Sequence, residues 1–410
     1  MTIENAKELK ECLCCGSTDL EVTLDLGVQP MANSFLESTD ETELTFPLVL
    51  NRCKNCYHLQ LSHAVDPDLL FKNYLYVSGT SQTLRDYFDW FANYTIEEFT
   101  RSNERRPTTI LDIACNDGSQ LNSYKAQGLS TYGIDPASNL FELSSANHNV
   151  ICDYFTDKYV DVYKDKNIDL ITAQNVFAHN SYPLEFLQQC KNIMGPNSLL
   201  FVQTSQAEMV KNNEFDTIYH EHLSFFNINS MNALAERAGL HLVNVTKTPI
   251  HGTSYVFIFS TEDPDTYFSV GKMLAEEIVQ GLTTEKTYIE YAEKCKQVVQ
   301  DLKDTIVAYR ADGFVIAGYG AAAKGMTLLN FGNITLDFII DDNPLKQGRF
   351  SPGMHIPVVS IDMLDECTDL NVAFVPLAWN FFDEIKRKIK TKRDNPEDVF
   401  IRYFPSIKVE

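Results

Sequence analysis

The 410-residue chain lacks three features that would each define a class of protein. It has no apolar run near the ~18 residues needed to cross a bilayer. Its opening residues, MTIENAKELKE, lack the basic and then apolar order of a secretory signal. Basic residues do not balance the acidic ones, and the net charge is −22. Because a phosphate backbone binds basic surfaces, we expect no nucleic-acid partner. The missing apolar run and the missing signal lead us to expect no membrane partner and a cytoplasmic location.

The chain is long enough to build more than one hydrophobic core. Its composition, 44% hydrophobic and 22% charged, is typical of folded globular proteins. The sequence shows no internal repeat of 20 to 50 residues. We expect three successive units: a cysteine-bearing unit over residues 1–75, an α/β unit over 76–265 and a second α/β unit over 266–410.

The pattern from Thr109 onward alternates short apolar runs with helical spacing, which is typical of a parallel sheet covered by helices on both faces. Strands are expected over residues 110–113, 131–134, 169–172, 198–202, 240–245 and 255–259. Before them, apolar residues recur at helical spacing at Leu84, Phe88, Phe91 and Phe99, and residues 101–107 indicate a loop. A second α/β unit is expected from strands over residues 313–317, 336–340 and 372–375. The predicted fold class is α/β: a small zinc-binding domain, a doubly wound domain and a Rossmann-like C-terminal domain.

Two Cys-x-x-Cys pairs stand in the first 56 residues, Cys12 with Cys15 and Cys53 with Cys56. Four thiolates form a closed tetrahedral zinc site, which leaves no open position for a substrate. We therefore expect one structural zinc ion, with Cys14 as a spare thiol that could confuse the first pair. The 37 residues between the pairs contain strand-like sequence, so a small β domain could fill the gap.

The strand expected at residues 110–113 ends in a polar turn, and Asp135 follows the next strand. Such a turn presents backbone N–H groups to a ligand, and a carboxylate after the second strand is placed to accept hydrogen bonds from ribose hydroxyls. The absence of G-x-G-x-x-G favours S-adenosylmethionine over a dinucleotide. The expected cofactor-binding residues are Asp112, Asn116, Asp117, Gly118, Asp135 and Asn175.

Several motifs together resemble the C-methyltransferases that act on nucleotide-linked 4-keto-6-deoxysugars. They are the cysteine pairs, YVSGTS at residues 76–81, ACNDG at 114–118, NVFAH at 175–179, FDTIYHEH at 215–222, GAAAKG at 320–325 and DNPLKQGR at 342–349. The resemblance implies a zinc domain, a central S-adenosylmethionine domain and a C-terminal domain that helps to hold a nucleotide-diphosphate sugar. By position it implies five active-site residues: Tyr76, His179, Tyr219, Glu221 and His222.

The chemistry of such a reaction gives these residues their expected roles. A carbon next to a ketone can be methylated once a general base removes its proton and donors hold the enolate oxygen. His222 is our first choice for the base and Tyr219 the second. Tyr76 and His179 are candidates to orient the sugar or stabilise the enolate. Glu221 could orient a histidine or anchor a sugar hydroxyl.

The C-terminal unit offers a second small-residue turn, in which Gly320 and Ala321 precede Lys324. Small residues let a backbone approach phosphates, and Lys324 adds a charge. We expect these residues, with Arg349, to bind the diphosphate. Tight packing of the strand on its helix is the other explanation for the small residues.

Two segments depart from the pattern of the family: Gln203 stands where an acidic residue is usual, and residues 251–255 read HGTSY in place of Gly-Gly-Ser and a basic residue. They leave two alternatives open. One is an O- or N-methyltransferase on a related sugar, and the other is a non-catalytic scaffold that binds nucleotide sugars.

Overall fold

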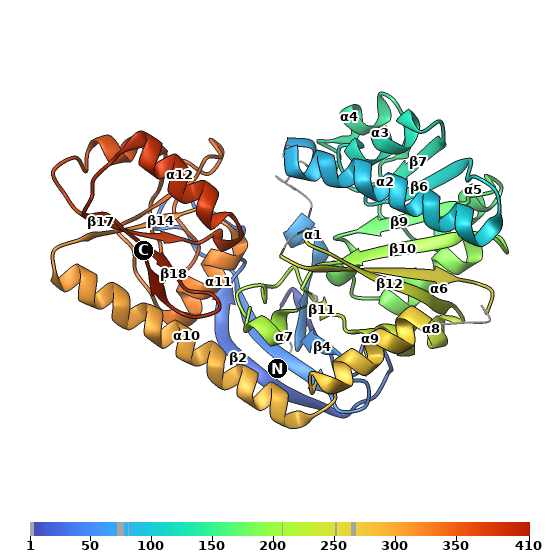
Figure 1. Cartoon of the computed structure of the whole chain (residues 1–410), viewed down its shortest axis with the longest axis horizontal. Coiled ribbons are helices and arrows are strands. Elements are labelled where there is room, and N and C mark those ends of the chain that lie inside the picture. The colour runs from blue at the N-terminus through green and yellow to red at the C-terminus, as the bar shows by residue number, and fades with distance from the viewer. Residues whose placement is uncertain (1–3, 72–77, 81, 207, 251, 264–267) are drawn as a thin grey trace.

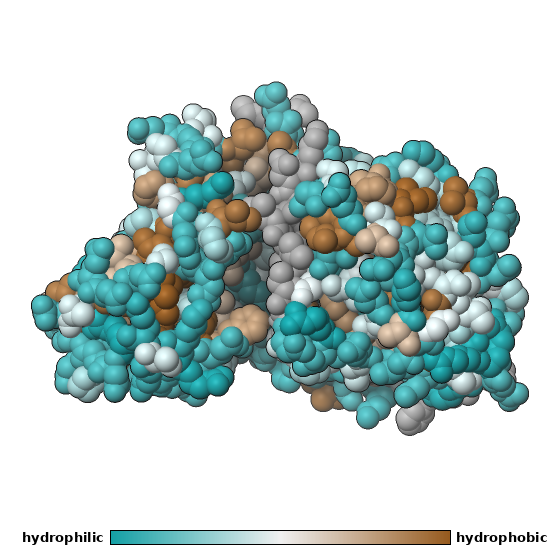
Figure 2. All heavy atoms as spheres, turned by 90° about the horizontal axis from the view of Figure 1, so that it is seen from above, coloured by the Kyte–Doolittle hydropathy of each residue, from teal (hydrophilic) through white to brown (hydrophobic). Residues whose placement is uncertain are grey.

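The structure, a computed structural model, describes residues 4–71, 78–80, 82–206, 208–250, 252–263 and 268–410. It contains a four-stranded, a seven-stranded and a six-stranded sheet, with a small β1–β5 pair beside the first. The six-stranded and seven-stranded units form two lobes, and β2 lies side by side with α10 beneath them (Figure 1). Seen from above, the molecule is hollowed between the lobes (Figure 2).

The N-terminal unit is a β structure, as the gap between the cysteine pairs suggested. Its sheet has the order β11-β4-β3-β2, with antiparallel neighbours. The elements of this unit are β1 (Ala6–Glu8), β2 (Leu20–Pro30), β3 (Thr45–Cys53), β4 (Leu59–Leu61), β5 (His63–Val65) and α1 (Pro67–Phe71). The fourth strand, β11 (Ser224–Phe225), comes from the middle of the chain. No pattern in the sequence predicted this strand. Because it lies between elements of the seven-stranded unit and pairs with β4, the two units share a sheet.

The seven-stranded sheet has the order β12-β13-β10-β9-β6-β7-β8. The five strands from β10 to β8 are parallel, and β13 and β12 add an antiparallel edge. The strands are β6 (Thr109–Ile113), β7 (Ser130–Ile134), β8 (Asn149–Ile151), β9 (Leu170–Gln174), β10 (Leu199–Thr204), β12 (His241–Thr248) and β13 (Ser254–Ser260). All six predicted strands are thereby confirmed, within one to three residues at each end.

Helices cover both faces of this sheet. One core joins α2 and α3 to alternate residues of the strands, and another joins α5, α6 and α8 to the residues between them. The helical elements are η1 (Ser78–Thr80), α2 (Gln82–Asn103), α3 (Ser119–Ala126), α4 (Phe141–Ser145), η2 (Asp157–Tyr159), α5 (Val160–Lys164), η3 (Phe177–His179), α6 (Pro183–Ile193), α7 (Met209–Asn212) and α8 (Ile228–Ala238). The predicted apolar face of α2 is buried, but α2 continues to Asn103, so the loop expected from residue 101 begins later.

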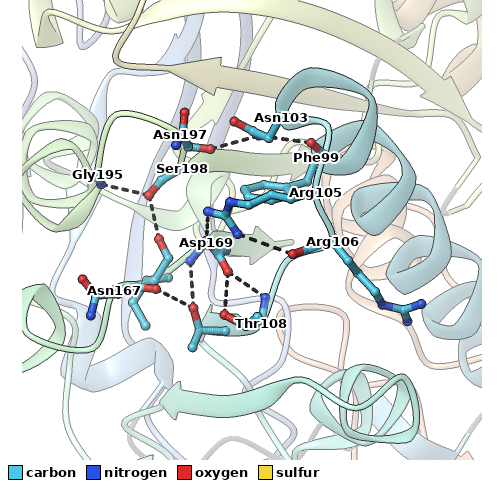
Figure 3. A network of polar contacts seen from close by, with 12 residues as sticks. Phe99, Asn103, Arg105, Arg106, Thr108, Asn167, Asp169, Gly195, Asn197 and Ser198 are labelled. Carbon is cyan, nitrogen blue, oxygen red and sulfur yellow. Dashed lines mark hydrogen bonds and ion pairs between the residues drawn. The ribbon is translucent and has the colours of Figure 1, made fainter.

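A polar network closes the amino-terminal edge of the sheet, opposite the site described below (Figure 3). The Asp169 carboxylate accepts hydrogen bonds from the Thr108 backbone N–H (2.6 Å) and hydroxyl (2.9 Å), and it pairs with Arg105 at 2.6 Å. Burial alone would raise the pKa of Asp169, but these partners hold it below its ordinary value. The contacts tie the segment that follows α2 to the start of β9.

The C-terminal unit is a second Rossmann-like sheet, with the order β16-β15-β14-β17-β18-β19 and a single antiparallel pair, β18–β19. Its strands are β14 (Val315–Tyr319), β15 (Phe338–Ile340), β16 (Val358–Val359), β17 (Val372–Pro376), β18 (Val399–Arg402) and β19 (Lys408–Val409). The helix α9 (Phe268–Val279) packs on β12 and α8 of the seven-stranded unit. The helices of the C-terminal unit are α10 (Glu285–Ala311), α11 (Ala323–Gly332), η4 (Ile361–Asp365), η5 (Trp379–Phe381) and α12 (Phe382–Lys392). One hydrophobic core runs from the N-terminal sheet into α10 and α11. The unit boundaries at residues 75 and 265 stay predictions.

No helix in the described part of the chain is long and apolar enough to cross a membrane.

Candidate active site

A cavity of about 360 Å³ opens at the carboxyl ends of β6, β7 and β9. Five of the six residues expected to bind the cofactor line it: Asp112, Asn116, Asp117, Asp135 and Asn175. Gly118, the sixth, does not line the cavity. It begins α3 at a φ of 80°, and a Cβ there would lie 3.2 Å from the Ser144 Cα, so the fold itself requires the glycine.

Asp135 holds the turn that follows β6 as well as facing the cavity. One carboxylate oxygen accepts from the Asn116 backbone N–H and the other from the Ala137 backbone N–H, both at 2.8 Å. Burial raises the pKa of Asp135 against these hydrogen bonds. The Asp135 carboxylate therefore holds the turn after β6 in place, and it is also the group expected to accept hydrogen bonds from a ribose.

Asn116 and Asp117 line the cavity, and their side chains also accept hydrogen bonds from the backbone of η1. The Ser78 N–H donates to the Asn116 side-chain oxygen at 3.0 Å, and the Gly79 N–H donates to Asp117 at 2.9 Å. A Cβ on Gly79 would lie 2.3 Å from the Ser119 hydroxyl oxygen, so only glycine allows this approach. These contacts hold η1 against the turn. Tyr76, one of the expected active-site residues, lies outside the described residues.

The donor set of the cavity fits S-adenosylmethionine. Aromatic rings of Phe88, Phe155 and Phe186 line it, and they suit an adenine or a thioether chain. Burial raises the pKa of Asp112 to about 7, although the Thr172 hydroxyl donates to it at 2.6 Å. A cationic ligand would restore the charge of that carboxylate.

Tyr219 and His222 form a hydrogen-bonded pair. The His222 Nδ1–H donates to the Thr217 carbonyl at 2.8 Å, because a carbonyl can only accept. The Gln206 amide also lies 3.2 Å from Nδ1, and this tautomer requires that amide to present its oxygen there. With the proton assigned to Nδ1, Nε2 is unprotonated and accepts from the Tyr219 hydroxyl at 2.9 Å. The two rings are 4.1 Å apart between centroids. The arrangement is that of a phenol whose proton can pass to an imidazole.

His179 lies between this pair and the cavity. It lines the cavity, and its ring centroid is 5.0 Å from that of His222. Its Nδ1–H donates to the Glu221 carbonyl oxygen at 2.6 Å, so its Nε2 is an acceptor. Burial lowers the pKa of His179, which keeps the imidazole neutral. The His179 ring thus separates the Tyr219–His222 pair from the cavity expected to hold the cofactor.

Glu221 orients His179 through its backbone, not through its carboxylate. The buried carboxylate accepts from the Asn33 side-chain amide at 2.6 Å. Burial raises the pKa of Glu221 to about 7, against the opposing effects of Asn33 and of Lys346 in the C-terminal unit. Neither partner was foreseen, because both come from other units of the chain.

His220, inside the same motif, has a structural place. Its Nε2–H donates to the Phe46 carbonyl at 3.3 Å, and burial lowers the pKa of His220 to about 4. Among the described residues only the four cysteines gather as a metal-binding group, so the histidines of the motif are not joined in one.

Gln203, the first departure from the family pattern, is fully buried on β10 of the seven-stranded sheet. Neither the oxygen nor the nitrogen of its side-chain amide has a hydrogen-bond partner in the described part of the chain. His251, which marks the other departure from the family pattern, lies outside the described residues.

The small-residue turn of the C-terminal unit lies between β14 and α11. Gly320 has a φ of 88°, and a Cβ there would lie 2.8 Å from that of Ala378, so packing explains this glycine. The Ala321 N–H donates to the Asp341 carboxylate at 2.6 Å. Lys324 lies over the ring of Trp379, 4.9 Å from its centroid. Arg349 pairs with Glu37 of the N-terminal unit at 3.5 Å, away from that turn.

Trp379 links the turn between β14 and α11 to the segment of residues 215–222. The sequence did not reveal this contact. The Trp379 indole N–H donates to the Asp216 carboxylate at 2.7 Å. Burial raises the pKa of Asp216 to about 6, with Lys324 and Trp379 opposing. The motif is therefore fastened to both lobes.

The zinc ligands converge as predicted. The ligand atoms of Cys12, Cys15, Cys53 and Cys56 all lie within 4.8 Å of one another. Four thiolates at this spacing suit a tetrahedral Zn²⁺. Cys14 is buried outside this group, so the first pair of ligands is Cys12 and Cys15.

Comparison with known proteins gives the chain a family. Three family models match it: "Putative zinc binding domain" over residues 12–71, "Methyltransferase domain" over 86–245 and "C-methyltransferase C-terminal domain" over 249–405. The C-methyltransferase NovU of Streptomyces niveus is 30% identical over 390 residues, which cover 92% of each chain.

More distant likenesses cover only part of the chain. A ubiquinone biosynthesis O-methyltransferase of Histophilus somni is 29% identical over 105 residues, 23% of this chain and 44% of that protein. The solved structure of the plantazolicin methyltransferase BamL in complex with a triazolic desmethylPZN analog and SAH is 13% identical, with a TM-score of 0.36, over 44% of this chain and 87% of that one. The full-length match carries the assignment: the chain belongs to the C-methyltransferase family, uses S-adenosylmethionine and carries a structural zinc site.

Proposed function

We propose that this enzyme methylates a carbon next to the ketone of a nucleotide-linked 4-keto-deoxysugar. The observation that carries the proposal is the Tyr219–His222 pair, placed one imidazole from the cofactor cavity. Methylation of oxygen or nitrogen needs no carbon-bound proton to be removed. A carbon-bound proton is far less acidic than an O–H or N–H proton, so carbon methylation depends more strongly on a positioned base such as this phenol and imidazole.

Bound S-adenosylmethionine supplies a methyl group on a positively charged sulfur. The protein has to remove one substrate proton beside it. We assign His222 as the base and Tyr219 as the group that carries the proton to it. The substrate proton passes to the Tyr219 oxygen as the phenol proton passes to His222 Nε2. The Thr217 carbonyl, which accepts from Nδ1–H, stabilises the imidazolium that forms.

The acceptor geometry of His179 narrows its role. Because Nδ1–H is bound to the Glu221 carbonyl, only Nε2 can face a substrate, and it is unprotonated. To donate to an enolate oxygen, His179 would need a second proton, which its burial opposes. We therefore propose that His179 accepts from a sugar hydroxyl. Glu221, protonated for part of the time near neutral pH, is proposed to bind another hydroxyl.

For the diphosphate we propose the turn at Gly320 and Ala321 together with Lys324. Lys324 supports this, since it lies in the first turn of α11, where a helix favours anions. The Asp341 carboxylate on the Ala321 N–H opposes it, because that donor is already used. Arg349 is the weaker candidate, because its guanidinium faces Glu37. None of the ten cysteines, all of which lie in the described residues, forms a disulfide, which fits our proposal of a cytoplasmic enzyme.

The test is reaction of the purified protein with a panel of nucleotide-linked 4-keto-6-deoxysugars. We expect one added methyl by mass spectrometry and a new carbon–carbon bond next to the ketone by NMR. Methyl transfer to a sugar oxygen or nitrogen instead would contradict the proposal. So would substrate binding without any transfer in the presence of S-adenosylmethionine.

A further inference from the structure

The segment of residues 215–218 is held at both of its ends by the C-terminal unit. The ring of its first residue, Phe215, packs edge to face on the rings of Phe331 and Phe404, with centroids 5.6 Å and 5.7 Å away. The carbonyl of its last residue accepts a hydrogen bond from the Thr327 hydroxyl at 3.1 Å. All four residues of the segment are buried. Their position therefore depends on how the C-terminal unit packs against them.

Trp379, in the same unit, holds the middle of this segment. Its indole N–H donates to the Asp216 carboxylate at 2.7 Å, and Asp216 is fully buried. Hydrogen bonds to charged groups are stronger than those between neutral groups. The indole ring packs against Phe404 at 5.4 Å and lies 4.9 Å from the Lys324 ammonium. Phenylalanine could make both ring contacts, so only the N–H is particular to tryptophan.

The residue after Asp216 connects this contact to the proposed base. The Thr217 carbonyl accepts from the His222 Nδ1–H at 2.8 Å. The opposite nitrogen, Nε2, is then free to accept from the Tyr219 hydroxyl at 2.9 Å. Because Asp216 and Thr217 are adjacent, a shift of the first moves the carbonyl of the second. The indole of one unit and the imidazole of another are thus joined through two neighbouring residues.

We propose that Trp379 is a positioning residue for the proposed base, His222. Its N–H holds Asp216, and the adjacent Thr217 carbonyl then selects the tautomer with the proton on Nδ1. This role rests on the proposed function, since it takes His222 as the base. The C-terminal unit then contributes to the rate of the reaction and not only to the binding of the substrate.

The experiment compares Trp379→Phe with Trp90→Phe, which alters the other tryptophan of the chain, on α2. Methylation is measured with the nucleotide-linked sugar of the panel that the wild type methylates. Trp379→Phe should lower kcat by about 10- to 100-fold, because a misplacement of about 1 Å can cost 10²-fold. It should leave the KM for the sugar unchanged, because both ring contacts are kept. Trp90→Phe should change neither value, and an unchanged kcat in Trp379→Phe would overturn the proposal.

A double variant separates positioning of the base from general support of the fold. In the His222→Ala background, Trp379→Phe should cause no further loss of rate, because the group that it positions is absent. A further loss as large as that in the wild type would show that Trp379 only supports the fold. A raised KM with an unchanged kcat would place Trp379 on the substrate, and either result would overturn the proposal. A wild-type rate in His222→Ala alone is a distinct result, which would refute the proposed base and with it this role for Trp379.

Two further measurements decide the matter if Trp379→Phe does not fold or no sugar of the panel reacts. Asp216→Asn keeps an oxygen that can accept from the indole, so it should retain more of the rate than Asp216→Leu; equal losses would count against the proposal. Long-range proton–nitrogen NMR reads the tautomer of His222 without substrate, with its signal identified by its absence in His222→Ala. The wild type should carry the proton on Nδ1 and Trp379→Phe a mixture of tautomers, and a wild-type spectrum in Trp379→Phe would overturn the proposal. Thermal unfolding and unchanged affinity for S-adenosylhomocysteine check that each variant is folded.

Discussion

Removal of the Tyr219 hydroxyl is the sharpest test of how the proton leaves the substrate. Tyr219→Phe keeps the ring, whose centroid lies 4.1 Å from that of His222, and deletes only the oxygen bound to His222 Nε2. If the phenol carries the proton to the imidazole, neither group works without the other. If His222 acts directly, the phenylalanine variant keeps most of its activity.

The size of the effect follows from this linkage. A positioned general base contributes about 10²–10⁴-fold, or roughly 3–5 kcal/mol of barrier. We expect Tyr219→Phe and His222→Ala each to lose that much. Because residues that act as a unit are not additive, the double variant should lose no more than the worse single variant. Independent groups would instead multiply, to roughly 10⁴–10⁸-fold.

The assay separates proton removal from methyl transfer. Exchange of the substrate's α-proton in deuterated water, measured by NMR with S-adenosylhomocysteine in the cofactor site, reports the first step alone. Methyl transfer is followed by mass spectrometry. Tyr309→Phe and His241→Asn make the same kinds of change away from the site and should leave both rates unchanged. Unchanged affinity for S-adenosylhomocysteine would show that the cofactor site is intact.

Two results would refute the reasoning. Wild-type exchange in Tyr219→Phe, with exchange lost in His222→Ala, would make His222 the direct base. Wild-type exchange in both variants would remove the pair from the chemistry and point to His179, whose Nε2 is also unprotonated.

Three further predictions concern metal, cofactor and stability. Cys53→Ser should lose zinc by metal analysis and unfold at a lower temperature, whereas Cys14→Ala should keep about one zinc per chain, and equal zinc in both would contradict the assignment. Asp135→Ala should weaken S-adenosylmethionine by roughly 1–3 kcal/mol in calorimetry, while Asp161→Asn on α5 should not, and unchanged affinity in a folded Asp135 variant would exclude it from the site. Asp169 has a lowered folded-state pKa, so its stabilisation is present above the ordinary value and is lost as pH falls through the folded one. Asp169→Asn should therefore unfold at lower denaturant than the wild type at pH 7, and the gap should narrow as the pH falls below the ordinary pKa value of about 4; a gap that does not narrow with falling pH would refute a charge effect.

The order of strands and helices could be predicted because each depends on neighbours in sequence. Strands such as β6 and β9 are buried on both faces, and they appear as continuous apolar runs. The zinc ligands were equally accessible, since each Cys-x-x-Cys pair is local. By contrast, β11 has two residues, and its Phe225 pairs with Leu59, far away in the chain. No local periodicity can announce a strand of that length.

The residues of the candidate site could be proposed from the sequence, but their contact partners could not. Tyr219 and His222 are three apart, so their contact is within reach of a sequence argument. The partner of Glu221 is Asn33, 188 residues away, and that of Asp216 is Trp379, 163 residues away. Such contacts arise only when the units pack together. From the sequence, Glu221 had two candidate roles, orienting a histidine or anchoring a sugar hydroxyl. In the structure its backbone carbonyl, not its carboxylate, contacts His179.

These distant contacts give the zinc unit a part in the proposed active site. Its sheet includes β11, which begins two residues after His222, and its Asn33 holds Glu221. From the other lobe, the Thr327 hydroxyl donates to the Ile218 carbonyl at 3.1 Å. The segment that carries the Tyr219–His222 pair, which we propose to be catalytic, is thus held by contacts from all three units. If the proposed pair removes the proton, loss of the structural zinc ion should lower the methylation rate, because the zinc-bearing sheet includes β11, two residues after His222.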